Sequence, residues 1–415
     1  MVWRLKSYTG DKPCSTTSKS THQFAQKTGR YRGMAGTLRS SKSKVLCYSH
    51  EASASPIAVA WMDASSAGRA MQHKSHITLS FVVPAFNMEV YLGRCVDPLL
   101  MAKDSSDIEI IVIDDGSSDG TAAIADGYAR RIPSVIRVLH QSNKGHGGAV
   151  NAGVALARGQ YVKVVDADDW VSPGSLERVM AVLRSECGRS EPVDLLVTDY
   201  VYDKVGRRHK HIVCFDRVMK SDTRLGWDDL GRFGLSQYLI MHSIFFRTEV
   251  LRRARLRLPE HTFYVDFIYA YEPLPYVKTL MYVDTPFYHY FIGREGQSVQ
   301  TNAMIARTDQ LVRVNHAMTL DTPEPDSVPD GLYHYMIHFL SITSVVTSVF
   351  LILSRRPVNY MIKDGLWRDI DMMSPRIGHD VRRTLASRAI NLPGRGGRFI
   401  IRYGYRVADR LVGFN

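Results

Sequence analysis

Cysteine is scarce in this sequence, and its few cysteines do not form a framework. The five lie far apart over 415 residues, and no two of them make a C-x-x-C pair. Disulfide-stabilised domains and cysteine zinc sites both depend on several closely spaced cysteines. The sequence therefore argues against both and favours a reducing, cytoplasmic compartment.

Long apolar runs are equally rare. The longest one, residues 336–353, is interrupted by His338 and five serine or threonine residues. Its 18 residues are at the lower limit for a membrane-spanning helix. We expect a buried or membrane-apposed helix there, with a true span as the alternative. The start of the chain also lacks the apolar stretch of a secretory signal.

Acidic residues are sparse only at the two ends of the chain. Of the formal net charge of +12, residues 1–75 contribute +9 and residues 376–415 contribute +7. Residues 76–375 are therefore at −4 and mildly acidic. A basic surface for nucleic acid is not a property of the chain as a whole, and we expect no specific nucleic-acid partner.

The basic segment 1–75 is rich in serine and threonine and has little apolar periodicity. A segment of this composition cannot bury enough apolar surface to offset its ordering entropy, so we expect it to be disordered. The alternatives are a basic tether for anionic lipid or nucleic acid, and an over-long start with initiation at Met34, Met62 or Met71.

From residue 77 onward, short apolar runs alternate with helix-like segments. Strands are expected at 77–83, 108–113, 135–139, 161–165 and 193–201, and helices at 89–102, 121–131, 148–157 and 173–184. This alternation predicts an α/β fold, a mostly parallel sheet with helices on both faces. Ligands bind such sheets at the carboxyl ends of the strands, so the residues that follow each strand are the informative ones.

Polar groups follow the second and third predicted strands. Asp114 and Asp115 end the second strand and could accept hydrogen bonds from a base or from ribose hydroxyls, although a solvated turn is the alternative. The run at 140–153 combines Lys144 with four glycines, which allow a backbone to approach a ligand closely. The run matches neither common phosphate-loop pattern, which disfavours a Walker-type nucleotidase.

The strongest local signal is the run Asp166-Ala167-Asp168-Asp169-Trp170 after the fourth strand. Three carboxylates within four residues repel one another unless a cation joins them. Mg²⁺ or Mn²⁺, held by one or two carboxylates and by diphosphate oxygens, suits such a run. An acidic helix N-terminus is the alternative.

Taken in order, these motifs resemble those of family 2 glycosyltransferases, which have the Rossmann-like A-type fold. The matching stretches are Val-Val-Pro-Ala-Phe-Asn at 82–87, Ile-Asp-Asp-Gly-Ser-Ser-Asp-Gly-Thr at 113–121, the Asn-Lys-Gly…Asn-Ala-Gly run at 143–153 and Asp-Ala-Asp-Asp-Trp at 166–170. The resemblance is strong over 77–185 and looser to about residue 300. It implies a catalytic domain over 76–300 and leaves 301–415 as a helical extension.

The resemblance also implies a nucleotide-sugar site. The implied nucleotide-binding residues are Pro84, Ala85, Phe86, Asn87, Glu89, Asp114, Asp115, Lys144 and Asp166. Asp168, with Asp166, would hold the metal that bridges the diphosphate. The expected cofactor is Mn²⁺ or Mg²⁺.

Family members carry a Glu-Asp pair whose Asp activates the acceptor hydroxyl, and here Val265 replaces the Glu while Asp266 remains. A carboxylate suffices as a base if it reaches the acceptor oxygen and if partial burial raises its pKa. Glu260 and Glu272 are competitors for this role, and a purely structural Asp266 is a further alternative.

Other residues are expected near the diphosphate or the acceptor. Arg294 resembles the cation that stabilises leaving-group charge in many relatives. Gln297 and Ser298 follow it in the same segment, and Trp170 closes the acidic run. His242 is a weaker candidate, because a lone histidine is more often structural.

The C-terminal part is predicted to be helical over 303–317, 330–353 and 357–372. Near the end, arginines recur every four residues from 398 to 410 beside an apolar stripe. This pattern is typical of a basic amphipathic helix on an anionic bilayer, and a helix docked on its own domain is the alternative. A Gln-x-x-Arg-Trp run, typical of processive polysaccharide synthases, is not found.

We therefore predict an inverting glycosyltransferase that moves a sugar from a nucleotide-diphosphate donor, a UDP-sugar, to a hydroxyl of a glycan or lipid-linked acceptor. Its products would be cell-surface polysaccharide or glycolipid, and its place the cytoplasm, peripheral to the inner face of the membrane. The alternatives are a sugar-phosphate nucleotidyltransferase and a non-catalytic module that binds glycan or nucleic acid.

Overall fold

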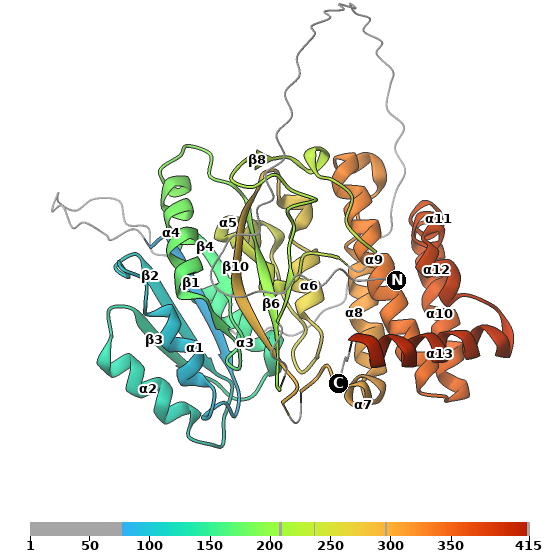
Figure 1. Cartoon of the computed structure of the whole chain (residues 1–415), viewed down its shortest axis with the longest axis horizontal. Helices are drawn as coiled ribbons and strands as arrows, with labels where there is room; N and C mark the ends of the chain where they lie inside the picture. The colour runs from blue at the N-terminus through green and yellow to red at the C-terminus, as the bar shows by residue number, and fades with distance from the viewer. Residues whose placement is uncertain (1–76, 207–209, 236, 295–296, 413–415) are drawn as a thin grey trace, which may run out of the picture. The chain divides into compact units, whose positions relative to one another are not determined.

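A ten-stranded sheet forms the centre of the described part of the chain (Figure 1). The computed structural model describes residues 77–206, 210–235, 237–294 and 297–412, so the segment predicted to be disordered lies outside the described residues. The strand order is β3-β2-β1-β4-β9-β6-β10-β5, with β7 on β6 and β8 on β10. The strands are β1 Leu79–Ala85, β2 Ile108–Asp114, β3 Ile136–His140, β4 Tyr161–Val164, β5 Trp170–Val171, β6 Leu195–Lys204, β7 His211–Val213, β8 Arg224–Leu225, β9 Ile244–Arg247 and β10 Leu280–Ile292.

The pairing confirms the predicted mostly parallel sheet. Strand β1 pairs in parallel with β2 and β4, β2 pairs in parallel with β3, and β6 pairs in parallel with β10. Strand β9 is antiparallel to both β4 and β6 and joins the two parallel halves. Every residue of β1 and β2 is buried, as expected when helices cover both faces of a parallel sheet.

Helices of the first half connect successive strands. They are α1 Leu92–Leu99, α2 Thr121–Arg131, α3 Gly145–Leu156 and α4 Pro173–Cys187. Helix α3 packs closely on β1. A Cβ at Gly153 would be only 2.1 Å from Val82 Cγ1, so the glycine makes this close packing possible. Shorter elements line the second half: the helices α5 Thr248–Ala254 and α6 Asp266–Tyr271, and the 3₁₀ turns η1 Trp227–Asp229, η2 Met241–Ser243, η3 Leu274–Tyr276 and η4 Pro325–Ser327.

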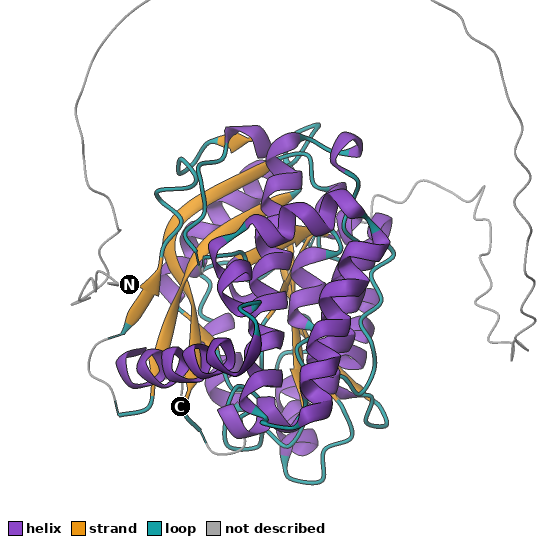
Figure 2. Cartoon of the chain, turned by 90° about the vertical axis from the view of Figure 1, so that its right-hand side faces the viewer, coloured by secondary structure: helices purple, strands orange, loops and turns teal. Residues whose placement is uncertain are grey.

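The C-terminal part is helical, as predicted, and Figure 2 views it face on. The helices are α7 Thr301–Ala306, α8 Thr308–Leu320, α9 Asp330–Leu353, α10 Pro357–Met373, α11 Pro375–Arg383, α12 Leu385–Ile390 and α13 Gly394–Val412. Helix α9 is the centre of this bundle and contacts α8, α10, α11, α12 and α13.

The hydroxyl residues of α9 join it to its neighbours. Ser344 Oγ accepts a hydrogen bond from Asn315 Nδ2 at 2.9 Å, and Ser348 Oγ accepts one from Trp367 Nε1 at 2.9 Å. By length and composition α9 is apolar enough to cross a membrane, with a mean hydropathy of 2.1, yet 67% of that window is buried inside the fold. Within the described chain it is a core helix of the bundle.

Candidate functional site

The loops that follow β1 and β2 are tied together by side chains predicted to bind nucleotide. Asn87, whose φ is +53°, accepts a hydrogen bond from Ser118 N at 2.8 Å. Glu89 Oε2 accepts one from Gly120 N at 2.7 Å. Helix α1 therefore begins only at Leu92, after this bonded loop. Phe86, in the same loop, is exposed.

Asp114 and Asp115 lie almost fully buried where β2 ends. Asp115 Oδ1 accepts hydrogen bonds from Gln141 Nε2 at 2.7 Å and from Lys144 N at 2.9 Å. Burial opposes the ionisation of Asp114, but hydrogen bonds from Ser117 and from the neighbouring histidine ring outweigh it and lower its pKa. Both carboxylates therefore hold the loops at this edge of the sheet in place.

The glycine-rich run lets another part of the chain approach α3. Asn151 exchanges two hydrogen bonds with the backbone of Leu258, at 2.8 and 2.9 Å. A Cβ at Gly147 would be 2.5 Å from Pro259 O, so only glycine permits this approach. Lys144 Nζ is 3.8 Å from the exposed Glu260. The glycines thus position the segment that leads to Asp266.

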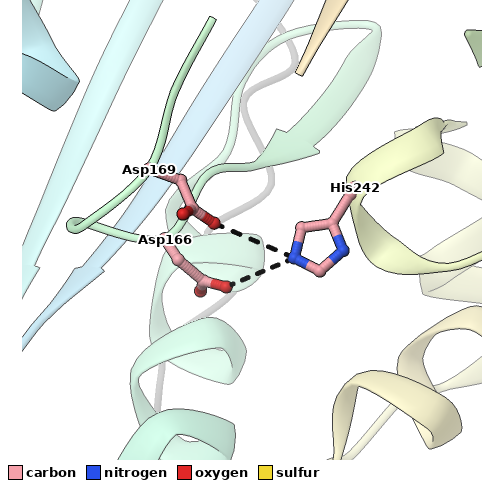
Figure 3. Close-up of side chains that lie close together, drawn as sticks. All are labelled: Asp166, Asp169 and His242. Atoms are coloured by element: carbon pink, nitrogen blue, oxygen red, sulfur yellow. Dashed lines mark ion pairs between the residues drawn. The ribbon is translucent and has the colours of Figure 1, made fainter. Parts of the chain in front are cut away.

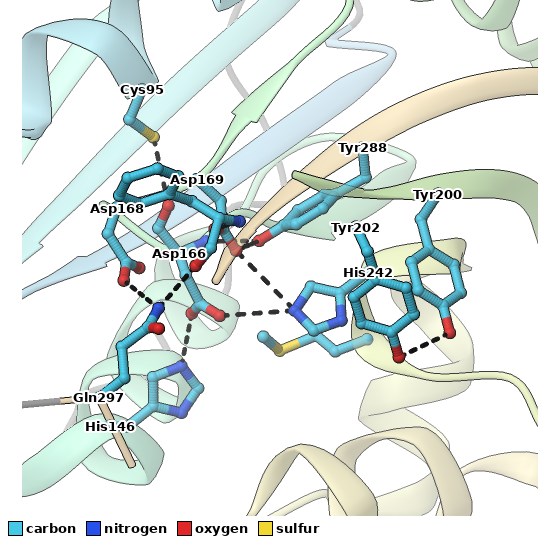
Figure 4. Close-up of polar contacts among 12 residues, drawn as sticks. Cys95, His146, Asp166, Asp168, Asp169, Tyr200, Tyr202, His242, Tyr288 and Gln297 are labelled. Atoms are coloured by element: carbon cyan, nitrogen blue, oxygen red, sulfur yellow. Dashed lines mark hydrogen bonds and ion pairs between the residues drawn. The ribbon is translucent and has the colours of Figure 1, made fainter. Parts of the chain in front are cut away.

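Asp166 is the meeting point of the two halves (Figure 4). Its Oδ1 lies 2.8 Å from Nε2 of His146, on the first turn of α3, and its backbone N–H donates to the Tyr288 hydroxyl at 3.1 Å. Burial opposes the ionisation of Asp166, but His146 outweighs it and the net effect lowers the pKa. Sequence reasoning did not single out His146, although a histidine inside a glycine run after a strand was a usable signal.

Asp168, in the acidic run, and Arg294, in the loop after β10, form an ion pair. Arg294 Nε donates to Asp168 Oδ2 at 2.6 Å. Gln297 Nε2 is 3.5 Å from the same oxygen (Figure 4). Gln297 also donates to Phe291 O at 2.6 Å and accepts from Gly293 N at 2.8 Å, which closes the loop after β10. The residue predicted to bind metal and the one predicted to stabilise the leaving group thus form an ion pair.

Asp169 is completely buried behind this pair. Its oxygens accept hydrogen bonds from the Tyr288 hydroxyl and from Phe291 N, both at 2.7 Å. Burial, and then the charges of Asp168 and Asp166, raise its pKa well above the usual value. Tyr288 therefore connects Asp166 with Asp169 through one hydroxyl group.

His242 faces these carboxylates from η2 (Figure 3). Its Nε2 lies 3.9 Å from Oδ2 of Asp166 and 3.9 Å from Oδ2 of Asp169, too long for hydrogen bonds. Neither ring nitrogen has a hydrogen-bond partner in the described part of the chain, and burial lowers the pKa of the ring to about 3, so it is neutral. The ring stacks on Tyr290 with centroids 4.3 Å apart.

Buried Lys163 on β4 supports the turn that carries His242. Its Nζ donates to the carbonyls of Met241 and His242, both at 2.7 Å, and to that of Ile244 at 3.2 Å. A lysine within an apolar strand is a sequence signal for a buried hydrogen-bond donor. The carbonyls that Lys163 bonds lie about 80 residues away in the sequence, so the signal does not identify them.

A divalent cation fits this set of side chains. Ligand atoms of Asp166, Asp169 and His242 lie within 4.8 Å of one another, and the histidine nitrogens have no other partner among the described residues. The two carboxylates suit Mg²⁺ or Mn²⁺, and substrate phosphate oxygens commonly complete the coordination of such an ion. Asp168 is outside this trio, and its role as a metal ligand stays a prediction.

Asp266 begins α6 and is only half-buried. Burial raises its pKa to about 6, an effect that His146 opposes and Asp166 reinforces. Of its two competitors, Glu260 is exposed, whereas Glu272 lies at the other end of α6, where burial and Asp321 raise its pKa to about 7.

Trp170 and Ser298 have structural contacts. The Trp170 indole stacks on His289 at 5.2 Å between centroids, and the Arg94 guanidinium lies 4.4 Å from the indole. Ser298 accepts a hydrogen bond from the Tyr264 hydroxyl through its backbone carbonyl at 3.0 Å. Their proposed roles at the diphosphate or acceptor stay predictions.

Residues 80–241 match the protein family described as Glycosyl transferase family 2. This segment is a family 2 glycosyltransferase domain. The chain is 27% identical over 228 residues to the glycosyltransferase EpsH of Bacillus subtilis, an alignment that covers 52% of this chain and 60% of EpsH. It is 36% identical over 108 residues to chondroitin synthase of Escherichia coli, covering 26% of this chain and 16% of the synthase.

The fold is also that of a solved glycosyltransferase. The crystal structure of Staphylococcus aureus TarS residues 1–349, in complex with UDP-GlcNAc, superposes with a TM-score of 0.59 at 17% identity, covering 80% of this chain and 92% of TarS 1–349. This likeness shows a shared fold. The chain spans 60% of EpsH and smaller fractions of several other curated relatives, so the activity of the whole protein is a matter for proposal.

Proposed function

We propose that the protein is an inverting glycosyltransferase that moves a sugar from a UDP-sugar to a hydroxyl group of a glycan or lipid-linked acceptor. One observation carries this proposal: His146 bonds to Asp166 at the end of β4, and the charges of both residues act on Asp266, which therefore lies near the acidic run. This proximity supports a base beside the donor-binding edge of the sheet. UDP-GlcNAc bound to TarS supports the choice of a uridine donor.

The chemistry is a single displacement. Asp266 takes the proton of the acceptor hydroxyl while the acceptor oxygen forms a bond to the anomeric carbon. The bond between that carbon and the diphosphate oxygen breaks, and its electron pair leaves with the nucleotide diphosphate. Attack from the face opposite the leaving group inverts the anomeric centre. A base with a pKa of about 6 is mostly ionised at neutral pH yet still accepts a proton efficiently.

Arg294 supplies positive charge on the donor side. Its guanidinium bonds to Asp168 at the sheet edge, where diphosphate oxygens would compete for the same donor group. Asp166, with Asp168 or with Asp169 and His242, would hold a divalent cation, which when bound neutralises diphosphate charge. We propose Mn²⁺ or Mg²⁺.

The pathway and location are likewise proposals. We infer that the product belongs to cell-surface polysaccharide or glycolipid, in line with the similarity to chondroitin synthase. A cytoplasmic site of action is supported by the thiols of Cys95 and Cys187, which form no disulfide within the part of the chain that the structure describes.

A donor panel tests the function. Purified protein is incubated with individual UDP- and GDP-sugars, Mn²⁺ and simple sugar acceptors, and both nucleotide release and the anomeric configuration of the product are measured. Release of UDP with an inverted product from one donor is expected. Pyrophosphate formed from UTP and a sugar 1-phosphate would instead favour a nucleotidyltransferase, and retained configuration would overturn the single displacement.

A further inference from the structure

Helix α13 has an inner side that docks on the bundle. The Tyr405 ring packs edge-on against Phe350 of α9 with centroids 5.8 Å apart, and its hydroxyl bonds to Thr301 of α7 at 2.8 Å. Arg402 bonds to the Tyr360 hydroxyl of α10, and the Arg398 guanidinium lies 4.7 Å from the Tyr360 ring. These contacts fix which side of α13 faces outward.

The opposite side of α13 is apolar and exposed. Phe399 is 68% exposed and Tyr403 is 61% exposed, and Ile400 and Val407 are exposed with them. Their spacing of three and four residues places them on one stripe, and the Phe399 and Tyr403 rings stack at 6.4 Å between centroids. We call this stripe the α13 outer face. Scattered exposed apolar residues are ordinary, but four on one stripe mark an interaction surface.

The charge around the α13 outer face is mostly positive, and the acidic residue of the helix is Asp409, near its end. Residues 385–408 contain five arginines and no acidic residue. Arg395 and Arg406, both exposed, lie beside the apolar stripe on the helix, and neither has an ion-pair partner among the described residues. Whatever covers this face must therefore offer both negative charge and an apolar layer.

We propose that the α13 outer face docks on the surface of an anionic phospholipid bilayer. An amphipathic helix of this kind lies in the interface plane, with its aromatic and aliphatic side chains in the acyl boundary and its arginines among the headgroups. A second copy of the chain would bring like charges together, and a nucleic acid would leave the apolar stripe exposed to water. The bilayer satisfies both properties of the face.

This surface is connected to the segment that closes the candidate site. Thr301, which bonds to Tyr405, begins α7 three residues after Ser298. The inner side of α13 therefore contacts the helix that follows the loop carrying Arg294 and Gln297. The inference itself stands apart from the proposed activity, because it concerns binding alone.

Co-sedimentation with vesicles tests the proposal. The full chain is mixed with large vesicles of phosphatidylcholine alone, or of phosphatidylcholine with 30 mol% phosphatidylglycerol (about a third anionic lipid, to give a strong surface potential), and the bound fraction is measured. Binding to the anionic vesicles and not to the neutral ones is expected. Because each arginine near such a surface is worth about a fivefold change in partition, Arg395→Gln with Arg406→Gln should weaken binding by about 25-fold.

Matched variants assign the binding to α13. Phe399→Ser with Tyr403→Ser should also abolish most binding, whereas Met101→Ser and Arg130→Gln, at exposed positions elsewhere, should leave it unchanged. Melting temperatures identify any variant that fails to fold, and Ile400→Ser then replaces it. Equal binding by all variants would overturn the proposal and assign the membrane to another basic segment. Dimerisation abolished by the same serine variants, or binding to DNA and not to vesicles, would also overturn it.

Discussion

The helical bundle and the candidate site both bury polar groups, but the hydroxyls of α9 have hydrogen-bond partners and the histidine of the site has none among the described residues. In the bundle, the buried hydroxyls of Ser344 and Ser348 each accept a hydrogen bond from a neighbouring helix. At the site, His242 has no partner on either ring nitrogen within the described ranges, and Asp169 is buried beside two other carboxylates. Buried polar groups without partners cost stability, so their retention marks a function.

The comparison therefore assigns stability to the bundle and chemistry to the site. Substitutions in the bundle should lower the free energy of unfolding and leave the chemical step unchanged. Substitutions at the site should lower the rate of the chemical step without lowering the free energy of unfolding.

Asp266→Asn should lower kcat by about 10²–10⁴-fold, since the amide keeps the shape of the carboxylate but accepts no proton at neutral pH. Affinity for UDP should change less than about twofold, because an interaction made mainly in the transition state affects kcat and kcat/KM together. Stopped assays and calorimetric titration with UDP measure the two quantities.

Glu260→Gln is the matched control for this substitution. It lies on the approach to α6 and is exposed, and among the described residues its carboxylate pairs only with Lys144, at 3.8 Å. Near-normal turnover is expected. If Glu260→Gln lost turnover and Asp266→Asn kept it, the base would be Glu260, and if neither lost turnover, Glu272→Gln would be examined next.

Trp367→Ala should destabilise the protein by about 3–5 kcal/mol, because it leaves a cavity in the bundle and removes the hydrogen bond to Ser348. Denaturant unfolding measures the change. The kcat per folded molecule should remain within about twofold of the parent value, since the substitution removes no group that we place at the reacting atoms. Met372→Ala, at an exposed position on the same helix, is the control and should be close to neutral. A large loss of kcat in the folded fraction of Trp367→Ala would show that bundle and site are coupled.

The fold was largely predictable because its signals are local. Apolar runs of strand length alternate with helical segments, and α2 occupies the predicted residues 121–131. The antiparallel strand β9 was missed as a partner of β4 and β6, since pairing between distant segments leaves no periodic signal. The start of α1 was also misplaced by three residues, because side chains of Asn87 and Glu89 bond to a distant loop.

The site was predictable only in part. The acidic run, Arg294 and Asp266 were identified from motifs, and the structure brings Arg294 onto Asp168. His146 and Lys163 were missed because their roles depend on partners 20 and about 80 residues away in sequence. Long-range contacts of this kind follow from the packing of α3 and η2 on the sheet.

The rate of transfer should depend on pH through Asp266. Its folded-state pKa of about 6 is above the usual value, so the ionised base is lost as the pH falls through 6. The groups that act on it are His146, which favours ionisation, and Asp166, which opposes it. We expect kcat/KM to fall about tenfold per pH unit below the pKa and to be flat just above it. The Asp266→Asn variant should lose this acid limb while keeping its low rate, and an unchanged limb in that variant would assign the titration to another group.

The smallest effects should differ in sign between the two regions. His242→Leu removes a neutral ring with two unpaired nitrogens and replaces it with an apolar side chain of similar volume, so the free energy of unfolding should rise by about 1 kcal/mol. Ser348→Ala instead leaves Trp367 Nε1 buried without an acceptor and should lower it by about 1 kcal/mol. Thermal or denaturant unfolding at one pH measures both. The leucine variant should also bind UDP with Mn²⁺ more weakly, since it removes a nitrogen that faces Asp166 and Asp169, whereas the alanine variant should bind it normally. If His242→Leu were destabilising by as much as Ser348→Ala, the ring would be a packing element of the core and the contrast between the two regions would fail at this residue.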